Sequence, residues 1–302
     1  MDAVLGTIMI SLVGEQPIPN LLAVLYAQPQ HAVLVCTERT KAVSERLRSV
    51  LKERGISVED EPVDVVDVDP YDMADIESKL KTVIRKKNWP PDKIVFNLTG
   101  GTKPMAFAAY RLAEQLSGPF LYVQSEGKSS RVYRYRFSER GPELEKADEV
   151  PPVLDIDLYL KAYLGGYTED ELREEFEKMV GAVLQQELEE VKTSVRPAGL
   201  GALEIDLVLR CGNRVGIAEV KTGGKAKKKE GIEQIITAAE QRFLGTYTKK
   251  FLILDREYEP NNLKLAKAHG ITVIELSSAQ NGELSKEDTE KLIQTVKTEL
   301  GG

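Results

Sequence analysis

The chain contains 302 residues, of which 42% are hydrophobic and 29% charged, and it carries a formal net charge of −7. This length suffices for two globular domains with separate cores, and the negative charge argues against a protein that coats nucleic acid with its whole surface. No apolar run approaches the roughly 18 residues needed to cross a membrane, and the apolar stretch at 3–13 lacks the basic flank of a signal peptide, so we expect a cytoplasmic protein.

The first part of the chain, residues 1–137, alternates short apolar runs with segments of helical periodicity. This alternation is typical of βαβ units and predicts an α/β domain with a mainly parallel sheet. The predicted strands cover 4–13, 32–37, 57–68, 93–98, 120–124 and 132–137. The predicted helices cover 19–26, 40–54, 71–87 and 104–116.

Two loops that follow predicted strands are candidates for ligand binding, since ligands of such sheets lie beyond the carboxyl ends of the strands. The first is VGEQPIPN at 13–20, and the second is NLTGGTK at 97–103, directly before a helix. In the second loop glycines let the backbone approach a ligand, threonines offer hydroxyl groups, and Lys103 lies near the positive helix end, a combination that suits an anionic phosphate. The spacings of a P-loop and of a dinucleotide fingerprint are missing. A helix cap with a tight turn is the alternative.

Together, LVGEQPIPN and NLTGGTKPM closely resemble the CARF domains of type III CRISPR ancillary proteins, over the whole first half of the chain. The resemblance implies a Rossmann-like sensor domain at 1–140 that binds cyclic oligoadenylate, commonly tetra-adenylate, at a homodimer interface. It implies these ligand-binding residues: Gly14, Gln16, Pro17, Thr37, Thr40, Gly100, Gly101, Thr102 and Lys103. Helix capping alone would also place a threonine at the strand end and another at the helix start after strand two.

Residues 138–155 are acidic, contain prolines and have weak periodicity, so we interpret 141–156 as a linker to a second domain at 157–302. One long helix is predicted over 168–189, with a capping box begun by Thr168 and an apolar stripe behind it. Further helices are predicted at 232–243, 262–269 and 285–300, and strands at 251–254 and 271–276. These mixed strands with flanking helices fit a restriction-endonuclease-like α/β core.

The stretch ALEIDLVLRCGNRVGIAEVKTG at 202–223 predicts a β-hairpin, because apolar residues alternate on both sides of a Gly-Asn turn. A two-residue loop fixes the register. Cys211 then faces Arg214, and the two strands can be counted outward from that pair. The alternative is the solvated face of an edge hairpin, although both strands are strongly apolar, which favours a buried central pair.

Counting outward places Asp206 opposite Glu219 and Glu204 opposite Lys221. Two facing carboxylates repel each other unless a cation lies between them. Mg²⁺ or Mn²⁺ is the natural occupant, because hard cations take oxygen ligands. Lys221 projects from the same face as Glu219, where it could support hydroxide formation and neutralise charge on a phosphorane.

The spacing of Asp206 and Glu219-Val220-Lys221 resembles the bipartite core of PD-(D/E)xK nucleases. The resemblance implies metal ligation by Asp206, Glu219 and Val220, with Lys221 assisting the attacking water. It also implies a helical glutamate, for which Glu177 in FEKMVGAVL is the candidate, although this side chain could instead face water. A fifth candidate catalytic residue is Glu204.

Five lysines lie within nine residues at 221–229 and could guide a phosphate, although a solvated loop explains them equally well. The two resemblances together imply a homodimeric CARF nuclease in which cyclic oligoadenylate switches on metal-dependent cleavage of DNA or RNA. A rival reading is a ligand-sensing regulatory protein whose nuclease-like half is silent. A metal-free ribonuclease is less favoured, because the chain has only two histidines and no Arg followed four to six residues later by His.

Overall fold

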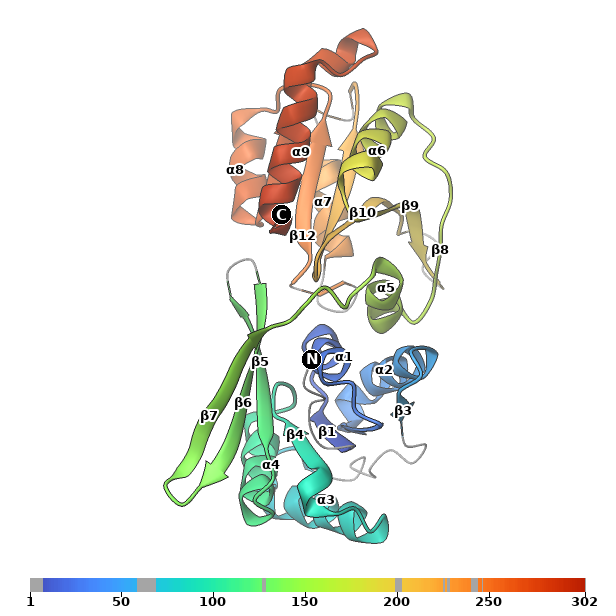
Figure 1. Ribbon diagram of the computed structural model, residues 1–302. Coiled ribbons are helices and arrows are strands. Elements are labelled where there is room, and N and C mark those ends of the chain that lie inside the picture. The colour runs from blue at the N-terminus through green and yellow to red at the C-terminus, as the bar shows by residue number, and fades with distance from the viewer. Residues whose placement is uncertain are drawn as a thin grey trace. The chain divides into compact units, whose positions relative to one another are not determined.

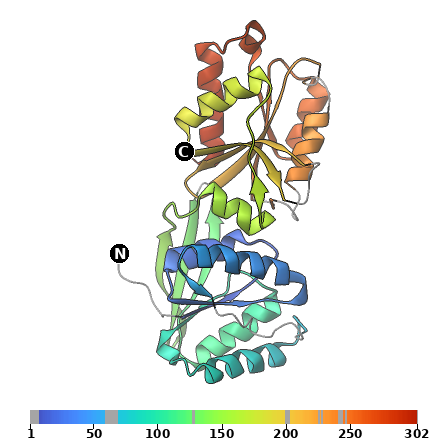
Figure 2. The same ribbon diagram turned by 90° about the vertical axis from the view of Figure 1, so that its right-hand side faces the viewer.

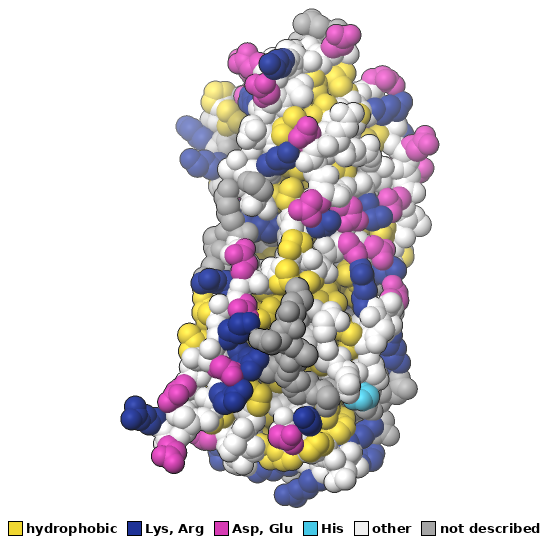
Figure 3. Space-filling view, in the orientation of Figure 1, with side chains coloured by type: hydrophobic (Ala, Val, Ile, Leu, Met, Phe, Trp, Pro, Cys, Tyr) yellow, Lys and Arg dark blue, Asp and Glu magenta, His cyan; other side chains and the backbone are white. Residues whose placement is uncertain are grey.

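The computed structural model describes residues 8–58, 69–126, 129–198, 203–224, 226, 229–239, 244–245 and 247–301. The chain divides into two compact units, Met1–Val153 and Leu154–Gly302. Each unit is built on one sheet with helices against it (Figures 1 and 2). On the face drawn in Figure 3, basic and acidic side chains are interspersed within each unit, so the net charge of −7 is not gathered in one region of that face.

Among its described residues, the first unit has a seven-stranded sheet in the order β3-β2-β1-β4-β5-β6-β7. Its strands are β1 (Ile8–Leu12), β2 (His31–Val35), β3 (Ser57–Val58), β4 (Ile94–Asn97), β5 (Phe120–Glu126), β6 (Ser129–Ser138) and β7 (Gly141–Glu149). The first five strands are parallel, and β6 and β7 extend the sheet antiparallel. The predicted segments at 4–7 and 59–68 lie outside the described residues.

In the described part of this unit, four α-helices cover the sheet. They are α1 (Ile18–Ala27), α2 (Lys41–Glu53), α3 (Met73–Lys86) and α4 (Lys103–Gln115), with short 3₁₀ turns η1 (Glu38–Thr40) and η2 (Pro91–Lys93) between them. Helices α3 and α4 pack together on one face, and α1 and α2 lie on the other (Figure 2). All five residues of β1 are buried, as a parallel strand covered on both faces requires. The strand order reverses between β1 and β4, the place where a crevice opens at the carboxyl ends of such sheets.

Strand β7 corrects the prediction of a linker at 141–156. It pairs along its length with β6, and cross-strand ion pairs join Glu145 to Arg134 at 2.5 Å and to Arg136 at 2.6 Å. Most of its side chains are exposed, so the sequence carries no apolar alternation that would indicate a strand. The last residue of the predicted linker, Ile156, begins a helix that the sequence analysis did not predict, α5 (Ile156–Leu164).

The residues described in the second unit form a six-stranded sheet in the order β13-β12-β11-β10-β9-β8. Its strands are β8 (Tyr167–Thr168), β9 (Glu190–Pro197), β10 (Ile205–Cys211), β11 (Arg214–Lys221), β12 (Lys249–Leu254) and β13 (Ile271–Glu275). Strands β8 to β11 are antiparallel, whereas β11, β12 and β13 are parallel. The predicted hairpin is therefore central, and the edge-hairpin alternative is wrong.

The helices of this unit after α5 are α6 (Glu175–Glu187), α7 (Glu230–Ala238), α8 (Pro260–Ala268) and α9 (Lys286–Leu300), with a 3₁₀ turn η4 (Ser277–Asn281). Helices α6 and α9 share a core on one face of the sheet, and α7 lies against the other (Figure 2). No helix among the described residues is long and apolar enough to span a membrane.

Helix α6 is shorter than the predicted helix at 168–189. Thr168 belongs to β8, where it pairs with Arg196, and the helix begins only at Glu175. The capping box is formed by Glu174 and Glu177. Tertiary pairing of β8 with β9 therefore overrides the local capping signal at Thr168.

Candidate functional site

The β10–β11 hairpin has the register that its Gly-Asn turn predicts. Cys211 lies opposite Arg214, and five consecutive pairs run from there without a shift. The next residues outward along the two strands are Asp206 and Glu219. Both are buried, at 9% and 3% exposed, and the backbone N–H of Val220 donates a 2.8 Å hydrogen bond to Asp206 Oδ2. Two carboxylates are therefore held side by side inside the unit.

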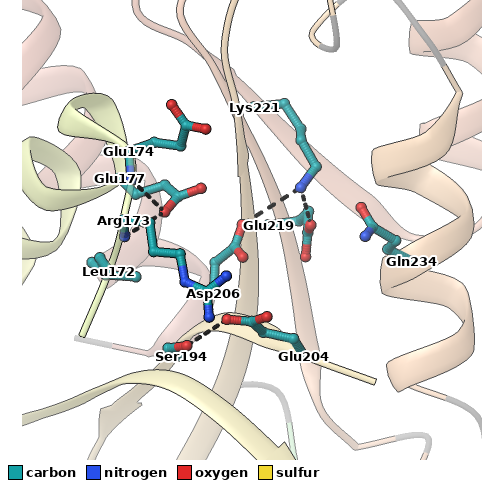
Figure 4. Close-up of a pocket in the computed structure, with 10 residues that line it drawn as sticks. All are labelled: Leu172, Arg173, Glu174, Glu177, Ser194, Glu204, Asp206, Glu219, Lys221 and Gln234. Atoms are coloured by element: carbon teal, nitrogen blue, oxygen red, sulfur yellow. Dashed lines mark hydrogen bonds and ion pairs between the residues drawn. The ribbon is translucent and has the colours of Figure 1, made fainter. Parts of the chain in front are cut away.

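These carboxylates line a pocket of about 240 Å³. Figure 4 shows the residues at the start of α6 on one side of the pocket and Gln234 of α7 on the other, with Asp206 and Glu219 between them. The side chain of Lys221 points to the same place: its Nζ contacts the Glu219 carboxylate and lies 3.8 Å from Asp206 Oδ2. The pocket thus joins two buried carboxylates and one partly buried ammonium group from adjacent strands.

Burial controls the proton affinity of this group. It raises the pKa of Asp206 and of Glu219, and for Glu219 the neighbouring Asp206 charge raises it further. Lys221 acts against both shifts. Burial tends to lower the pKa of Lys221, but the two carboxylates outweigh it, so that pKa is raised. A single ammonium faces two carboxylates, and a cation of higher charge would stabilise the pair more completely.

The donor set fits a hard divalent cation in type, because Asp206, Glu219 and the Val220 carbonyl offer only oxygen. Within the described ranges, no group of three or more His, Cys, Asp or Glu side chains is arranged to hold a metal ion. Any ion at this place would therefore take at most two carboxylates from the pair and complete its coordination with backbone oxygen and water, which is how Mg²⁺ is commonly bound in proteins.

The carboxylate of Glu204 bonds to residues of β9, whereas the ammonium group of Lys221 contacts Glu219, so these two side chains have different partners. Strand β10 begins at Ile205, and the Glu204 carboxylate accepts a hydrogen bond from Ser194 Oγ and pairs with Arg196 at 2.8 Å. Burial alone would raise the pKa of Glu204, but these two partners on β9 outweigh it and lower that pKa. Glu204 borders the pocket as an already paired carboxylate.

Glu177 lines the pocket but also serves its own helix. Its Oε2 accepts hydrogen bonds from the backbone N–H groups of Arg173 at 3.3 Å and Glu174 at 3.2 Å, which caps α6. Its charge also raises the pKa of Asp206 and of Glu219. Three of the five lysines predicted as a phosphate guide, Lys225, Lys227 and Lys228, lie outside the described residues.

In the first unit, the loops after β1 and β4 meet at the strand-order reversal. A Cβ added to Gly100 would lie 2.1 Å from the Leu12 carbonyl oxygen and 2.9 Å from the Gly14 nitrogen. Glycine at 100 is therefore required because the two loops touch. Gly101 has φ +75°, a conformation that favours glycine for a different reason.

A buried amide network, which the sequence analysis missed, lies beneath these loops. Asn97 Nδ2 donates to Asn20 Oδ1 at 3.1 Å and to Ser11 Oγ at 3.2 Å, and Asn20 Nδ2 donates to the Leu12 carbonyl at 3.0 Å. The N–H and hydroxyl of Thr99 donate to Asn97 Oδ1. Polar residues at the ends of otherwise apolar strands, Ser11 in IMISL and Asn97 in IVFN, were the available signal.

Residues 8–144 match the family model described as the Card1 CARF domain. This part of the chain is a CARF domain. The resemblance stated for the first half of the sequence is thereby confirmed, and the topology of the CARF domain places both loops on which it depends at the same end of the sheet. No curated protein sequence matches the chain.

The similarity of fold to solved structures extends beyond the CARF domain. Can2 from Sulfobacillus thermosulfidooxidans in complex with cyclic tetra-adenylate has a TM-score of 0.73 at 16% identity, covering 97% of each chain. Protein VC1899 from Vibrio cholerae has a TM-score of 0.72 at 13% identity, covering 98% of this chain and 99% of that one.

A type III CRISPR defence DNA nuclease activated by cyclic oligoadenylate has a TM-score of 0.58 at 17% identity, covering 84% of this chain and 46% of that one. The likeness to these three proteins is one of fold. The predicted α/β class, a Rossmann-like CARF domain followed by a second α/β domain, is confirmed.

The predicted ligand residues of the CARF domain differ in their freedom to meet a ligand. The hydroxyls of Thr37 and Thr40 are buried and 3.3 Å apart, within a cap of η1. Thr102 caps α4 and donates to the Pro70 carbonyl at 2.8 Å.

Lys103, the first residue of α4, is exposed and has no ion-pair partner in the described part of the chain. In the first loop Pro17 is buried at the start of α1, whereas Gly14 and Gln16 are half-buried.

Proposed function

We propose that this protein is an effector nuclease of type III CRISPR defence, in which cyclic oligoadenylate bound by the CARF domain activates phosphodiester cleavage of DNA or RNA by the second unit. The observation that carries the proposal is the cluster of the buried Asp206 and Glu219 with Lys221, in a chain that shares the fold of Can2 over 97% of its length. The activator is proposed as cyclic tetra-adenylate because the Can2 structure contains that ligand.

In this proposal Mg²⁺ or Mn²⁺ would be held by Asp206, Glu219 and the carbonyl of Val220, and it would supply positive charge at the phosphate and acidity to a bound water. The chain's own residues do the rest. Lys221, fixed between the carboxylates, neutralises negative charge that develops on the phosphorus-bound oxygens. Glu177 caps the start of α6, whose residues line the pocket.

The CARF domain would bind the activator where the β1 and β4 loops meet. Lys103 contributes a free positive charge at the N-terminus of α4, where the backbone N–H groups and the helix dipole also favour phosphate. A cyclic symmetric ligand is best matched by an isologous dimer. Phe107 lies one turn after Lys103 on the same helix and is 58% exposed, so it is a suitable residue to bury between two CARF domains.

A second candidate function is a cyclic-oligoadenylate-sensing regulator whose second unit is silent. It is favoured by one observation: the ammonium group of Lys221 already lies against both carboxylates, where a metal ion would have to bind. The two functions differ in whether the intact acidic pair hydrolyses nucleic acid.

The deciding experiment incubates the purified protein with single- and double-stranded DNA and RNA, with and without each cyclic oligoadenylate, in Mn²⁺, Mg²⁺ or EDTA. We expect cleavage that requires both activator and metal and that disappears in Glu219→Gln. Activator binding without cleavage of any substrate would favour the silent regulator. Calorimetry of the same sample should give one ligand per two chains, and one ligand per chain would contradict the shared-ligand dimer.

A further inference from the structure

Gln234 carries a buried hydrogen-bond acceptor that no described residue satisfies. Its Oε1 is shielded from solvent and has no hydrogen-bond partner among the described residues. The residue lies on α7 and lines the same pocket as Asp206, Glu219 and Lys221. Figure 4 shows its amide pointing from α7 toward the side chains of Lys221 and Glu219.

The position of Gln234 is set by close packing of α7 on β11. A Cβ added to Gly231 would lie 2.8 Å from Leu252 Cδ1, 3.5 Å from Lys221 Cγ and 3.9 Å from Glu219 Cγ. The helix backbone therefore approaches the acidic pair at Gly231. Gln234, three residues later, projects from the same side of the helix, so its amide is brought to the pocket by the fold itself.

A buried acceptor without a partner lowers the stability of a protein, and replacing it by an apolar side chain of similar shape removes that cost. Methionine has nearly the length of glutamine and no strong acceptor. A position at which glutamine is structurally unfavourable, beside the proposed catalytic pair, points to a ligand that completes the hydrogen bond.

The chemistry of the amide restricts that ligand. A carbonyl oxygen only accepts, so its partner has to donate a proton, which a phosphate oxygen at neutral pH does not do. When a phosphodiester is bound next to Asp206 and Glu219, two O–H groups can lie at the scissile phosphate. One is the attacking water, and the other, in RNA, is the ribose 2′-hydroxyl. Both present the same chemistry to Oε1.

We propose that Gln234 accepts a hydrogen bond from a hydroxyl group at the scissile phosphate and thereby positions it; this inference rests on the proposed nuclease function. In the hydrolysis step, the water oxygen forms the new bond to phosphorus and loses its proton to solvent. The ester P–O bond breaks, and the leaving oxygen takes a proton from solvent. Gln234 is a positioning residue in this step: it orients the O–H group and exchanges no proton itself.

The test compares Gln234→Met with Gln185→Met, a control at an exposed position of α6 in the same unit. Thermal unfolding is measured in EDTA, and kcat and KM are measured on DNA and RNA of the same sequence with saturating cyclic tetra-adenylate and Mn²⁺. We expect Gln234→Met to unfold at the wild-type temperature or above, with kcat lowered about tenfold or more and KM little changed. The control should match wild type in all three.

The substrate arms separate the two sources of the hydroxyl. An equal loss on DNA and RNA assigns the attacking water, and a loss confined to RNA that disappears with a single deoxynucleotide at the scissile position assigns the ribose. An unchanged kcat in Gln234→Met, or unfolding at a clearly lower temperature than the control, would overturn the proposal. Absence of cleavage by the wild-type protein would overturn the nuclease function as well, so the two failures are distinguishable.

Discussion

The backbone N–H of Val220 and the side chain of Asp206 form a 2.8 Å hydrogen bond between β11 and β10. The bond fixes one carboxylate oxygen of Asp206 against the strand that carries Glu219, so Asp206 has little freedom to turn away from the like charge opposite. The acidic pair is therefore held together by the backbone, in spite of its repulsion.

Removing one charge from this pair should abolish cleavage without unfolding the protein. Asp206→Asn and Glu219→Gln are each expected to reduce cleavage by about 100-fold or more, because each removes an anionic ligand of the proposed metal. In EDTA both variants should be as stable as wild type or more stable, since one of two repelling buried charges is gone. Gel-based cleavage and thermal unfolding test both statements, with Glu175→Gln on the exposed side of α6 as the control. Full activity in Glu219→Gln would remove the pair from the mechanism.

Lys221→Met should have the opposite effect on stability. Its ammonium group is the cation seen between Asp206 and Glu219, and all three side chains are at most 13% exposed. Removing one partner of a buried ionic group costs about 3 kcal/mol or more, so metal-free Lys221→Met should unfold at lower denaturant concentration than wild type. Turnover should fall more than Mn²⁺ affinity, because the proposed role of Lys221 lies in the transition state. Calorimetric titration with Mn²⁺ that shows an equal loss of affinity and turnover would contradict this role.

Asp255 gives a pH-dependent prediction. Burial tends to raise its pKa, but hydrogen bonds from Arg256, Thr222 and Gly223 outweigh burial and lower the pKa to about 2. An acid with a lowered pKa stabilises the folded state above its unfolded pKa, near 3.8, and loses that contribution as the pH falls toward 2. Asp255→Asn should therefore cost about 2 kcal/mol at pH 7 and less at pH 3.

Urea unfolding at pH 7, 5 and 3 measures this difference, with Asp92→Asn at an exposed position as the control. A gap between wild type and Asp255→Asn that widens as the pH falls would show that the lowered pKa has the wrong sign. Asp255 also connects the chain after β11 to the end of β12, so the same variant tests how firmly that connection is held.

In the CARF domain, Lys103→Ala should weaken binding of cyclic tetra-adenylate and leave the fold intact. The side chain is exposed and contributes charge to an anion, and a charged hydrogen bond contributes about 1.5–3 kcal/mol, or roughly tenfold to hundredfold in affinity. Isothermal titration calorimetry provides the measurement. Lys93→Ala, also exposed but at the opposite end of β4, is the control and should bind like wild type. Unchanged affinity in Lys103→Ala would exclude this residue from the site.

Gly100→Ala should lower both stability and activator affinity, because the new Cβ would overlap the Leu12 carbonyl. We expect a loss of about 1–3 kcal/mol, the usual cost of overpacking. Gly224→Ala is the matched control, since no atom of the described residues lies within 4 Å of its added Cβ and its φ is not positive. If the two variants unfold alike, the contact between the two CARF loops is not as close as the structure has it.

The sequence predicts the parts of this fold whose signals are local. The hairpin register follows from a two-residue turn, and most helices and buried strands follow from apolar periodicity. Strand β7 has no such signal, because a strand exposed on both faces is specified only by its pairing with β6. The predicted start of α6 at Thr168 is wrong, because the pairing of Thr168 with Arg196 outweighs a local helix cap.

In the candidate site, too, the local contacts could be predicted from the sequence and the tertiary contacts could not. The pairing of Asp206 with Glu219 could be counted along the hairpin, whereas the partner of Glu204 depends on β9, a strand that the hairpin spacing does not describe. Gln234 could not be found in the sequence at all. Its significance comes from an acceptor that remains unsatisfied after α7 has packed on β11, and that is a property of the folded chain.

The hydrogen bond between Asn97 and Asn20 has a consequence for how the CARF domain can respond to a ligand. The two amides come from positions 77 residues apart, one directly before the β4 loop and the other at the start of α1. If one loop moves, either the buried amide network breaks or the other loop moves with it. Breaking the network is costly, because it leaves a buried amide without a hydrogen-bond partner. The loops should therefore behave as one mechanical element, and a double-mutant cycle between Gly14 and Lys103 for activator binding should show strong non-additivity.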